Sequence, residues 1–315
     1  AVRRGRVRAE RAMESFVERR TCEVCGALDA ATLCSAPFTD PRVWDFLQQY
    51  YAGKIAPADV GDARYEVRRC NACGFLWQAY VLDARGMGRL YEDWIGAEHS
   101  LAKKTRADAA LFERYAAEAA AISTLLGRPP HEIRVLDFGM GWGFWCRMAA
   151  AFGYDVEGFE ASEARRAYAR GMGVRVVDAL GDRPRYDFVH CHHALEHIAS
   201  PYDTLAALAR VLTPGGVIGI SVPDGRGVAE RLRRPDWRAA KDALHPLEHV
   251  NCFEAHTLLS LCRRAGLEPV PAAAARRAPP QPRSRLARCV RTLRAVRRPR
   301  EPFGSGTSRY FRKPA

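Results

Sequence analysis

Four of the ten cysteines form two matched pairs, Cys22 with Cys25 and Cys70 with Cys73, and a glycine follows each pair. Two thiolates separated by two residues can bind one tetrahedral ion, and the glycine permits the tight turn that the pair needs. Together the pairs predict a closed four-cysteine zinc site with a structural role, because four protein ligands leave no position for a substrate. The 44 residues between the pairs must then form a folded insertion. Disulfide or redox chemistry is the alternative, which a reducing cytosol disfavours.

A second set of residues follows a short apolar segment at 133–138. The segment from Asp137 to Gly143 has glycine at every second position after Phe138. Such glycines let the backbone approach a ligand closely, and the helix that follows offers free N–H groups. Glu160 ends the next apolar segment, where a carboxylate can accept both hydroxyls of a ribose. Phe144 breaks the dinucleotide fingerprint, and no Gly-Lys-Ser/Thr follows for a phosphate loop.

Strand and helix patterns alternate along the region that must position these residues. This alternation predicts a doubly wound α/β fold, a seven-stranded, mostly parallel Rossmann-like sheet with helices on both faces. The expected strands are 133–138, 155–159, 174–177, 186–191, 217–222, 267–270 and 308–313. The expected helices are 103–126, a segment ending near 152, one that starts after Ser162 and ends near 171, 201–212 and 254–265.

Four segments resemble motifs of one enzyme family. VLDFGMGWGFW at 135–145 resembles the first motif of class I S-adenosylmethionine-dependent methyltransferases. The segments 186–201, 212–216 and 248–253 resemble the later motifs of the ubiquinone-biosynthesis-like branch, and the set covers roughly residues 100–270. The cysteine-rich segment ahead of such a domain is similar to that of methyltransferases in sugar, polysaccharide and natural-product pathways. The resemblance implies an enzyme that uses S-adenosylmethionine on a small molecule.

The resemblance also implies roles for individual residues. Glu160 would hold the ribose, Asp178 would meet the adenine amine, and His192 would face the cofactor. The other implied cofactor-binding residues are Asp137, Phe138, Gly139, Gly141 and Gly143.

A Glu-His pair, Glu248 and His249, matches the place of a proton-abstracting pair in sugar C-methyltransferases. His249 is therefore the predicted base, with Glu248 and His197 as the other predicted catalytic residues. The alternative is that His249 is a hydrogen-bonded structural histidine. The tyrosine that those enzymes carry just before the pair is absent, since Pro246 and Leu247 stand there. This departure favours methylation of oxygen over methylation of carbon.

A second metal is left open by the same resemblance. Related quinone O-methyltransferases place Glu-x-x-Glu-His after the fourth strand and are thought to hold a divalent metal there. This chain has His193, Glu196 and His197 at that place, and a His/Glu/His set can bind metal. The alternative is that Glu196 and His197 only cap and orient the following helix.

The positive charge is concentrated at the two ends of the sequence. The formal net charge is +13, of which residues 1–20 carry +4 and residues 276–315 carry +12, so the remaining 255 residues sum to −3. A polyanion-binding catalytic body is therefore not expected, and nucleic acid is disfavoured as a partner. An RNA or protein methyltransferase recruited through the zinc module and the basic tail remains an alternative, as does a non-catalytic scaffold that binds S-adenosylmethionine.

The predicted domain organisation follows from these features. We expect a basic, disordered head at 1–20, a zinc-binding module at 21–100, and a catalytic domain at 101–272 plus 305–315. Residues 273–304 form a Pro- and Arg-rich insertion whose thin apolar stripe suits a membrane surface or an acidic partner. No apolar run is long enough to span a bilayer, so the expected location is cytoplasmic. The sequence predicts no oligomeric state.

Overall fold

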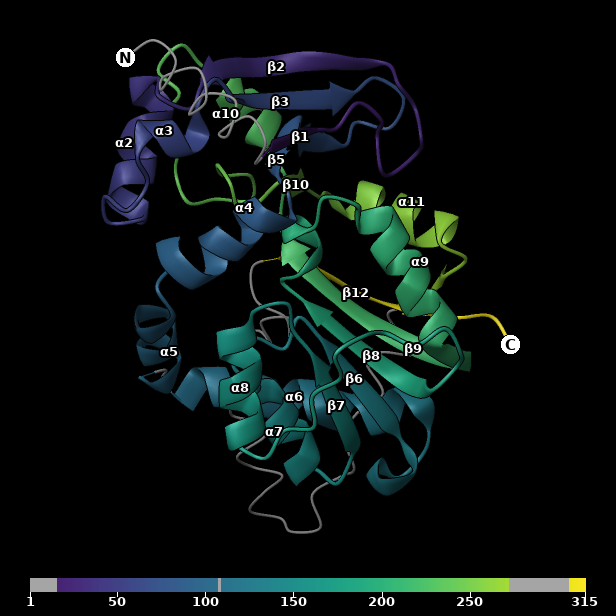
Figure 1. The fold of residues 1–315 in the computed structure, drawn as a ribbon. Helices are drawn as coiled ribbons and strands as arrows, with labels where there is room; N and C mark the ends of the chain where they lie inside the picture. The colour runs from purple at the N-terminus through teal and green to yellow at the C-terminus, as the bar shows by residue number, and fades with distance from the viewer. Residues whose placement is uncertain (1–15, 107–108, 272–305) are drawn as a thin grey trace, which may run out of the picture.

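The computed structural model describes residues 16–106, 109–271 and 306–315 (Figure 1). A six-stranded sheet forms its centre, in the order β11-β12-β9-β8-β6-β7. Strands β6, β7, β8 and β9 are parallel, and β12 runs antiparallel to its neighbours β9 and β11. The strands are β6 (Arg134–Phe138), β7 (Asp155–Phe159), β8 (Tyr186–His192), β9 (Leu212–Pro223), β11 (Glu268–Pro269) and β12 (Gly306–Arg312). The predicted doubly wound α/β fold is therefore confirmed.

Helices cover both faces of this sheet. One hydrophobic cluster packs α9 and α11 against the strands, and another packs α6, α7 and α8 against the opposite side of the same strands. These helices are α6 (Ala109–Leu126), α7 (Phe144–Ala151), α8 (Glu163–Gly171), α9 (Pro201–Val211) and α11 (Ala255–Arg264). Ser162 caps α8 as expected, since its hydroxyl accepts a hydrogen bond from Arg165 N. None of the helices in the described ranges has the length and apolar character to cross a bilayer.

The predicted strand at 174–177 is not a regular strand in the structure. It contacts β7 through a single parallel bridge between Gly158 and Val176. Two backbone hydrogen bonds of 2.8 and 2.9 Å, through Arg175 O and Val177 N, support that bridge. The segment lies beyond the edge strand β7 with most of its side chains partly or fully exposed. An edge segment in which only Val174 is buried gains little from extending the ladder, so the seventh position of the sheet is only this bridge.

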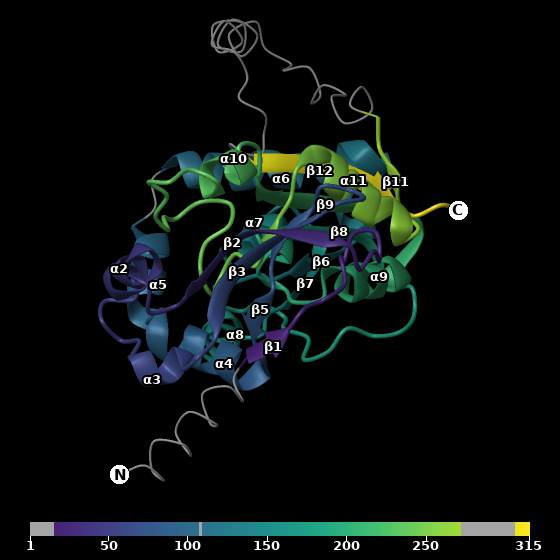
Figure 2. The ribbon, with the colours of Figure 1, turned by 90° about the horizontal axis from the view of Figure 1, so that it is seen from above.

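A second, four-stranded sheet lies above the ends of β8 and β9 (Figures 1 and 2). Its order is β10-β4-β3-β2, and β10 comes from the C-terminal half of the chain. The strands here are β2 (Ala30–Pro37), β3 (Arg64–Cys70), β4 (Leu76–Gln78) and β10 (Asn251–Cys252), with β1 (Phe16–Glu18) and β5 (Tyr80–Leu82) paired as a separate ribbon. The predicted module at 21–100 therefore shares a sheet with the region predicted to be catalytic.

Residues 16–20, expected in a disordered head, instead belong to the folded structure. Phe16–Glu18 pairs with β5, and the buried Arg19 donates to Asn251 Oδ1 at 2.8 Å. This hydrogen bond ties β1 to β10 across 232 residues of sequence. The rest of the predicted head, residues 1–15, and the whole basic insertion at 273–304 lie outside the described residues.

The segment between the cysteine pairs folds as an insertion, as predicted. Its helix α2 (Pro41–Tyr50) begins at Asp40, whose side chain accepts from Arg42 N, and buries Val43 and Leu47. Both residues belong to a hydrophobic cluster that joins the insertion to residues 228–252. The remaining helices are α3 (Pro57–Val60), α4 (Ala84–Arg89), η1 (Leu90–Trp94), α5 (Ala97–Thr105), η2 (Pro130–Glu132), η3 (Leu195–His197) and α10 (Val228–Leu232).

Candidate active site

A cavity of about 820 Å³ lies between the central sheet and the N-terminal insertion. Its lining on the sheet side comes from the turn after β6, from the end of β8 and from α6. Its opposite side comes from Tyr50 at the end of α2 and from the segment 241–249. The cavity thus sits at the carboxyl ends of the parallel strands, where ligands of open α/β sheets bind.

The glycine-rich turn borders this cavity through two of its three glycines. Gly139, Gly141 and Gly143 all have positive φ, at 75°, 56° and 77°. A methyl group placed on Gly141 would meet no atom within 4 Å, so the space above it is open to a ligand. The corresponding methyl on Gly143 would lie 3.1 Å from both Ala169 and Val174. Gly143 therefore permits the packing of α7 against its neighbours, and it does not line the cavity.

The carboxylate of Asp137 lines the cavity and is held by two neighbouring side chains. Its Oδ1 lies 2.7 Å from His190 Nδ1, and its Oδ2 accepts from Cys146 Sγ at 3.3 Å. Asp137 is 2% exposed, so both interactions are buried. Its neighbour Phe138 stacks on Phe159 with a centroid distance of 5.3 Å. Both residues support the turn from beneath.

Glu160, directly after β7, connects the glycine-rich turn to the start of α8 through two hydrogen bonds. Its Oε2 accepts from Gly141 N at 2.9 Å, and its Oε1 accepts from Ser162 N at 3.1 Å. A carboxylate has further lone pairs, so these bonds leave capacity for a ribose hydroxyl. Asp178, in contrast, has a side chain that is 78% exposed and paired with Arg170 at 2.5 Å, away from the cavity lining. The cofactor contacts of both acids stay predictions.

The predicted catalytic residues come together on the other side of the cavity. The rings of His197 and His249 have centroids 4.8 Å apart, and those of His245 and His249 are 4.0 Å apart. His249 Nδ1 donates to Asp242 O at 2.8 Å, which leaves Nε2 as its basic nitrogen. Burial and the adjacent imidazoles of His245 and His197 lower the pKa of His249 to about 2. His249 is therefore neutral, with its Nε2 unprotonated.

Two tyrosines that sequence reasoning missed complete this side. Tyr51 Oη donates to Glu248 Oε1 at 2.9 Å, and Tyr50 lines the cavity. Burial, reinforced by the Glu248 carboxylate, raises the pKa of Tyr50 to about 12. Lys241 Nζ lies 5.0 Å from the centroid of the Tyr50 ring. Two tyrosines thus lie near Glu248 and His249. They come from the C-terminal end of α2, whereas sugar C-methyltransferases carry a tyrosine just before the Glu-His pair.

A buried polar cluster at the sheet side of the cavity was also missed. Glu118 of α6 accepts from Trp145 Nε1 at 3.1 Å, and the Trp145 ring stacks on His190 at 3.7 Å. Burial lowers the pKa of His190, but the carboxylates of Asp137 and Glu118 outweigh that effect and raise it. Burial and the neighbouring His190 lower the pKa of His192. The sequence signal for this cluster is the His-x-His spacing in β8, since alternate residues of a strand share a face.

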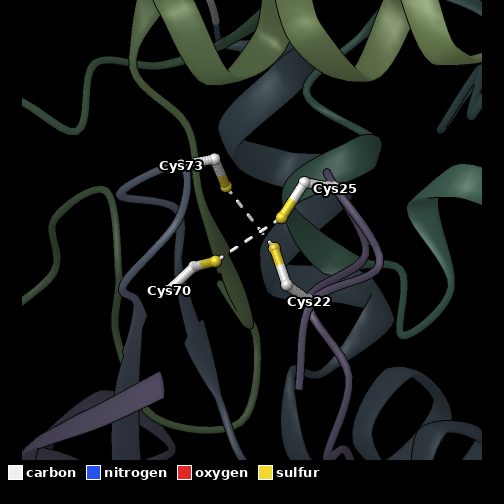
Figure 3. A group of neighbouring side chains, drawn as sticks. All are labelled: Cys22, Cys25, Cys70 and Cys73. Carbon is white, nitrogen blue, oxygen red and sulfur yellow. Dashed lines mark hydrogen bonds between the residues drawn. The ribbon is translucent and has the colours of Figure 1, made fainter. Parts of the chain in front are cut away.

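The four predicted zinc ligands lie close together where β3 ends at Cys70 (Figure 3). Cys22 Sγ lies 3.6 Å from Cys73 Sγ, and Cys25 Sγ lies 3.5 Å from Cys70 Sγ. Sulfur ligands of a tetrahedral zinc ion lie about 3.8 Å apart, so this donor set fits one. All four thiols are free, and disulfide sulfurs would be only about 2 Å apart.

Comparisons with known proteins give the following matches. The family model described as Methyltransferase domain matches residues 108–272. A ubiquinone biosynthesis O-methyltransferase of Aromatoleum aromaticum is 34% identical over 155 residues, covering 43% of this chain and 64% of that protein. A ubiquinone biosynthesis O-methyltransferase of Alkalilimnicola ehrlichii is 37% identical over 95 residues, covering 26% of this chain and 38% of that protein. The chain thus spans less than two thirds of these relatives.

Among solved structures, one match is the 1,6-didemethyltoxoflavin-N1-methyltransferase of Burkholderia thailandensis, determined with 1,6-didemethyltoxoflavin and S-adenosylhomocysteine bound. It is 20% identical with a TM-score of 0.47, over 78% of this chain and 98% of that one. A likeness of this degree supports no statement about the substrate of the present chain.

Proposed function

The chain belongs to the methyltransferase domain family, and from this premise we propose that it transfers a methyl group from S-adenosylmethionine to a small-molecule acceptor. The proposed acceptor atom is an oxygen, as in a sugar, a polysaccharide precursor or a natural product. The observation that carries the proposal is that the glycine turn after β6 and the neutral His249 line one cavity. A methyl donor bound at the glycine turn and an acceptor bound at His249 would lie in the same cavity.

The proposed cofactor residues are those of the turn and of the strand ends around it. Gly139 and Gly141 would allow the backbone to approach the methionine end, while Asp137 and Phe138 would hold the turn in place. Glu160 would accept from the ribose hydroxyls, and Asp178 is proposed to reach the adenine amine. His192 would border the cofactor, since it lines the cavity at the end of β8. When bound, S-adenosylmethionine supplies a methyl group that is activated for attack by its positive sulfur.

The proposed base is His249. An acceptor hydroxyl must lose its proton as its oxygen forms the new bond, and Nε2 of His249 would take that proton as the negative charge developing on the acceptor raises the low pKa of the imidazole. The hydrogen bond from Nδ1 to Asp242 O fixes the tautomer and directs the basic Nε2 elsewhere in the site. Glu248 and His197 would orient the acceptor and His249, respectively. The phenol of Tyr51 restrains Glu248 from the far side.

The cluster of four cysteines is proposed to hold a structural zinc ion. Cys22 and Cys70 are buried in the same hydrophobic cluster as residues of β8, α9 and α11. An ion there would join the two cysteine turns and anchor the insertion that carries α2. Four thiolates leave no open position, so the ion would take no part in methyl transfer.

The test is a calorimetric titration of the zinc-loaded chain with S-adenosylmethionine and S-adenosylhomocysteine. Wild type is expected to bind both, Glu160→Ala to lose binding, and Glu163→Gln to bind as wild type. Glu163 is the matched control because it is a nearby exposed acid at the start of α8. Transfer of labelled methyl from the cofactor to panels of sugars and phenols would then identify the acceptor. Absence of binding by wild type would refute the proposal.

A macromolecular acceptor has no observation in its favour within the described residues. The basic tail that would recruit RNA or protein lies mostly outside them.

A further inference from the structure

The polar cluster beneath the cavity has the composition of a metal site distinct from the four cysteines. One ligand atom each from Glu118, His190 and His192 lies within 4.8 Å of the others. Glu118 Oε2 is 3.5 Å from His190 Nε2, and Glu118 Oε1 is 3.7 Å from His192 Nδ1. Nitrogen and oxygen ligands of a tetrahedral ion lie about 3.4 Å apart, so the spacing suits one ion between them.

The ring of His190 is oriented by its neighbours in the way that is typical of a metal-binding histidine. Its Nδ1 bonds to Asp137 Oδ1 at 2.7 Å, and its ring stacks on Trp145 at an interplanar angle of 8°. A carboxylate on one ring nitrogen fixes the tautomer and makes the other nitrogen a better ligand. That other nitrogen, Nε2, is buried and has no hydrogen-bond partner, while the residue is only 6% exposed. An unsatisfied buried nitrogen is costly, and an ion would satisfy it.

The buried negative charge of Glu118 and Asp137 also favours a metal ion at this cluster. The side chains of Glu118 and Asp137 are each 4% exposed. The cation found near Glu118 is Arg114, whose Nε is 3.9 Å from Oε1 and whose side chain is 43% exposed. Buried carboxylates need a close counter-charge, and His190 between Glu118 and Asp137 supplies one only when it is protonated. A divalent ion would balance both.

We propose that Glu118, His190 and His192 bind a divalent transition-metal ion, with zinc as the ion that the ligand set suits best. His190 and His192 are alternate residues of β8 and so present their rings on one face of the sheet. Glu118 reaches them from α6. All three line the cavity, so the fourth position of the ion faces it and can take a water or an oxygen of a bound small molecule. This site does not depend on methyl transfer.

The first experiment counts metal in the full chain. The protein is loaded with zinc, dialysed against metal-free buffer and analysed by elemental mass spectrometry. Wild type is expected to retain two equivalents, one for each cluster, and Glu118→Gln and His192→Asn are expected to retain one. Glu118→Gln keeps the size of the side chain, and circular dichroism with the retained cysteine-bound equivalent shows that the fold is intact.

The control is His249→Asn, which alters the neighbouring Glu196, His197 and His249 group instead. This variant is expected to retain two equivalents. Loss of the second equivalent in His249→Asn but not in Glu118→Gln would assign the ion to that other group and overturn the proposal.

Cobalt distinguishes the two sites without reference to activity. Cobalt bound by four thiolates gives intense sulfur-to-metal charge-transfer absorption, whereas a nitrogen and oxygen site gives only weak ligand-field bands. Titration of the apo chain should therefore give both signals in wild type and only the thiolate signal in Glu118→Gln. A wild-type protein with a single, thiolate-bound ion would leave a proton on His190 as the counter-charge, and it would refute the second site.

Discussion

The phenol of Tyr51 donates a 2.9 Å hydrogen bond to Oε1 of Glu248, joining residues that are 197 positions apart in the sequence. Tyr51 is 1% exposed and Glu248 is 8% exposed, so the bond is shielded from water. Tyr51 follows α2, which lies between the two cysteine pairs, and Glu248 precedes the predicted base His249. The N-terminal insertion is thus part of the site and not an appendage to it.

Removing this donor should destabilise the protein. Tyr51→Phe keeps the ring but leaves a buried carboxylate oxygen short of a donor, which costs about 1–3 kcal/mol. Urea unfolding would measure the loss, with Tyr80→Phe on β5 as the control that should unfold as wild type. S-adenosylhomocysteine affinity should not change, because Tyr51 does not line the cavity. An unfolding midpoint equal to that of wild type would mean that water replaces the phenol.

Gly143 should be required for stability more than for cofactor contact. Its φ of 77° and the 3.1 Å approach to Ala169 and Val174 mean that Gly143→Ala strains the backbone and crowds α8. We expect a loss of more than about 1 kcal/mol in the free energy of unfolding. Gly181→Ala is the control, since its methyl would meet no atom within 4 Å. Equal stability of the two variants would contradict this assignment.

The sequence predicts the parts of the fold that have local signals. The segments at 134–138, 155–159 and 186–192 are apolar runs between turn residues, and each became a strand. Residues at the ends of such runs, such as Asp137 and His192, could be placed near one another because the carboxyl ends of parallel strands meet. The run at 174–177 looked equivalent, but periodicity does not reveal that a segment lies at an exposed edge.

Contacts between distant segments had no such signal. The pairing of β10 with β4 and the approach of Tyr51 to Glu248 depend on how two halves of the chain pack. Glu118 lies within an ordinary amphipathic helix, and only the structure shows that it faces His190. The sequence therefore predicted single residues that line the cavity, such as His192 and His249, and missed those that surround them.

Removal of the ion that we propose for the cluster of four cysteines should destabilise the whole chain. Cys22 and Cys70 are buried in a cluster that includes residues of β8 and α11, so loss of the ion would loosen the central sheet as well as the insertion. A strong chelator, or Cys25→Ser, should lower the thermal midpoint by on the order of 10 °C. Cys34→Ser, at a half-buried cysteine outside the cluster, is the control. A midpoint that is insensitive to both treatments would exclude a structural ion.

Stability should fall on acidification because His249 resists protonation in the folded state. Its pKa is lowered from the usual 6.5 to about 2, chiefly by burial. Below pH 6.5 the unfolded chain binds a proton that the folded chain does not, so the stabilisation is complete above that pH and is lost as the pH falls toward 2. Each such histidine contributes a slope of up to about 1.4 kcal/mol per pH unit. Urea unfolding at a series of pH values should show a shallower slope in His249→Gln, and an unchanged slope would place the acid sensitivity in other groups.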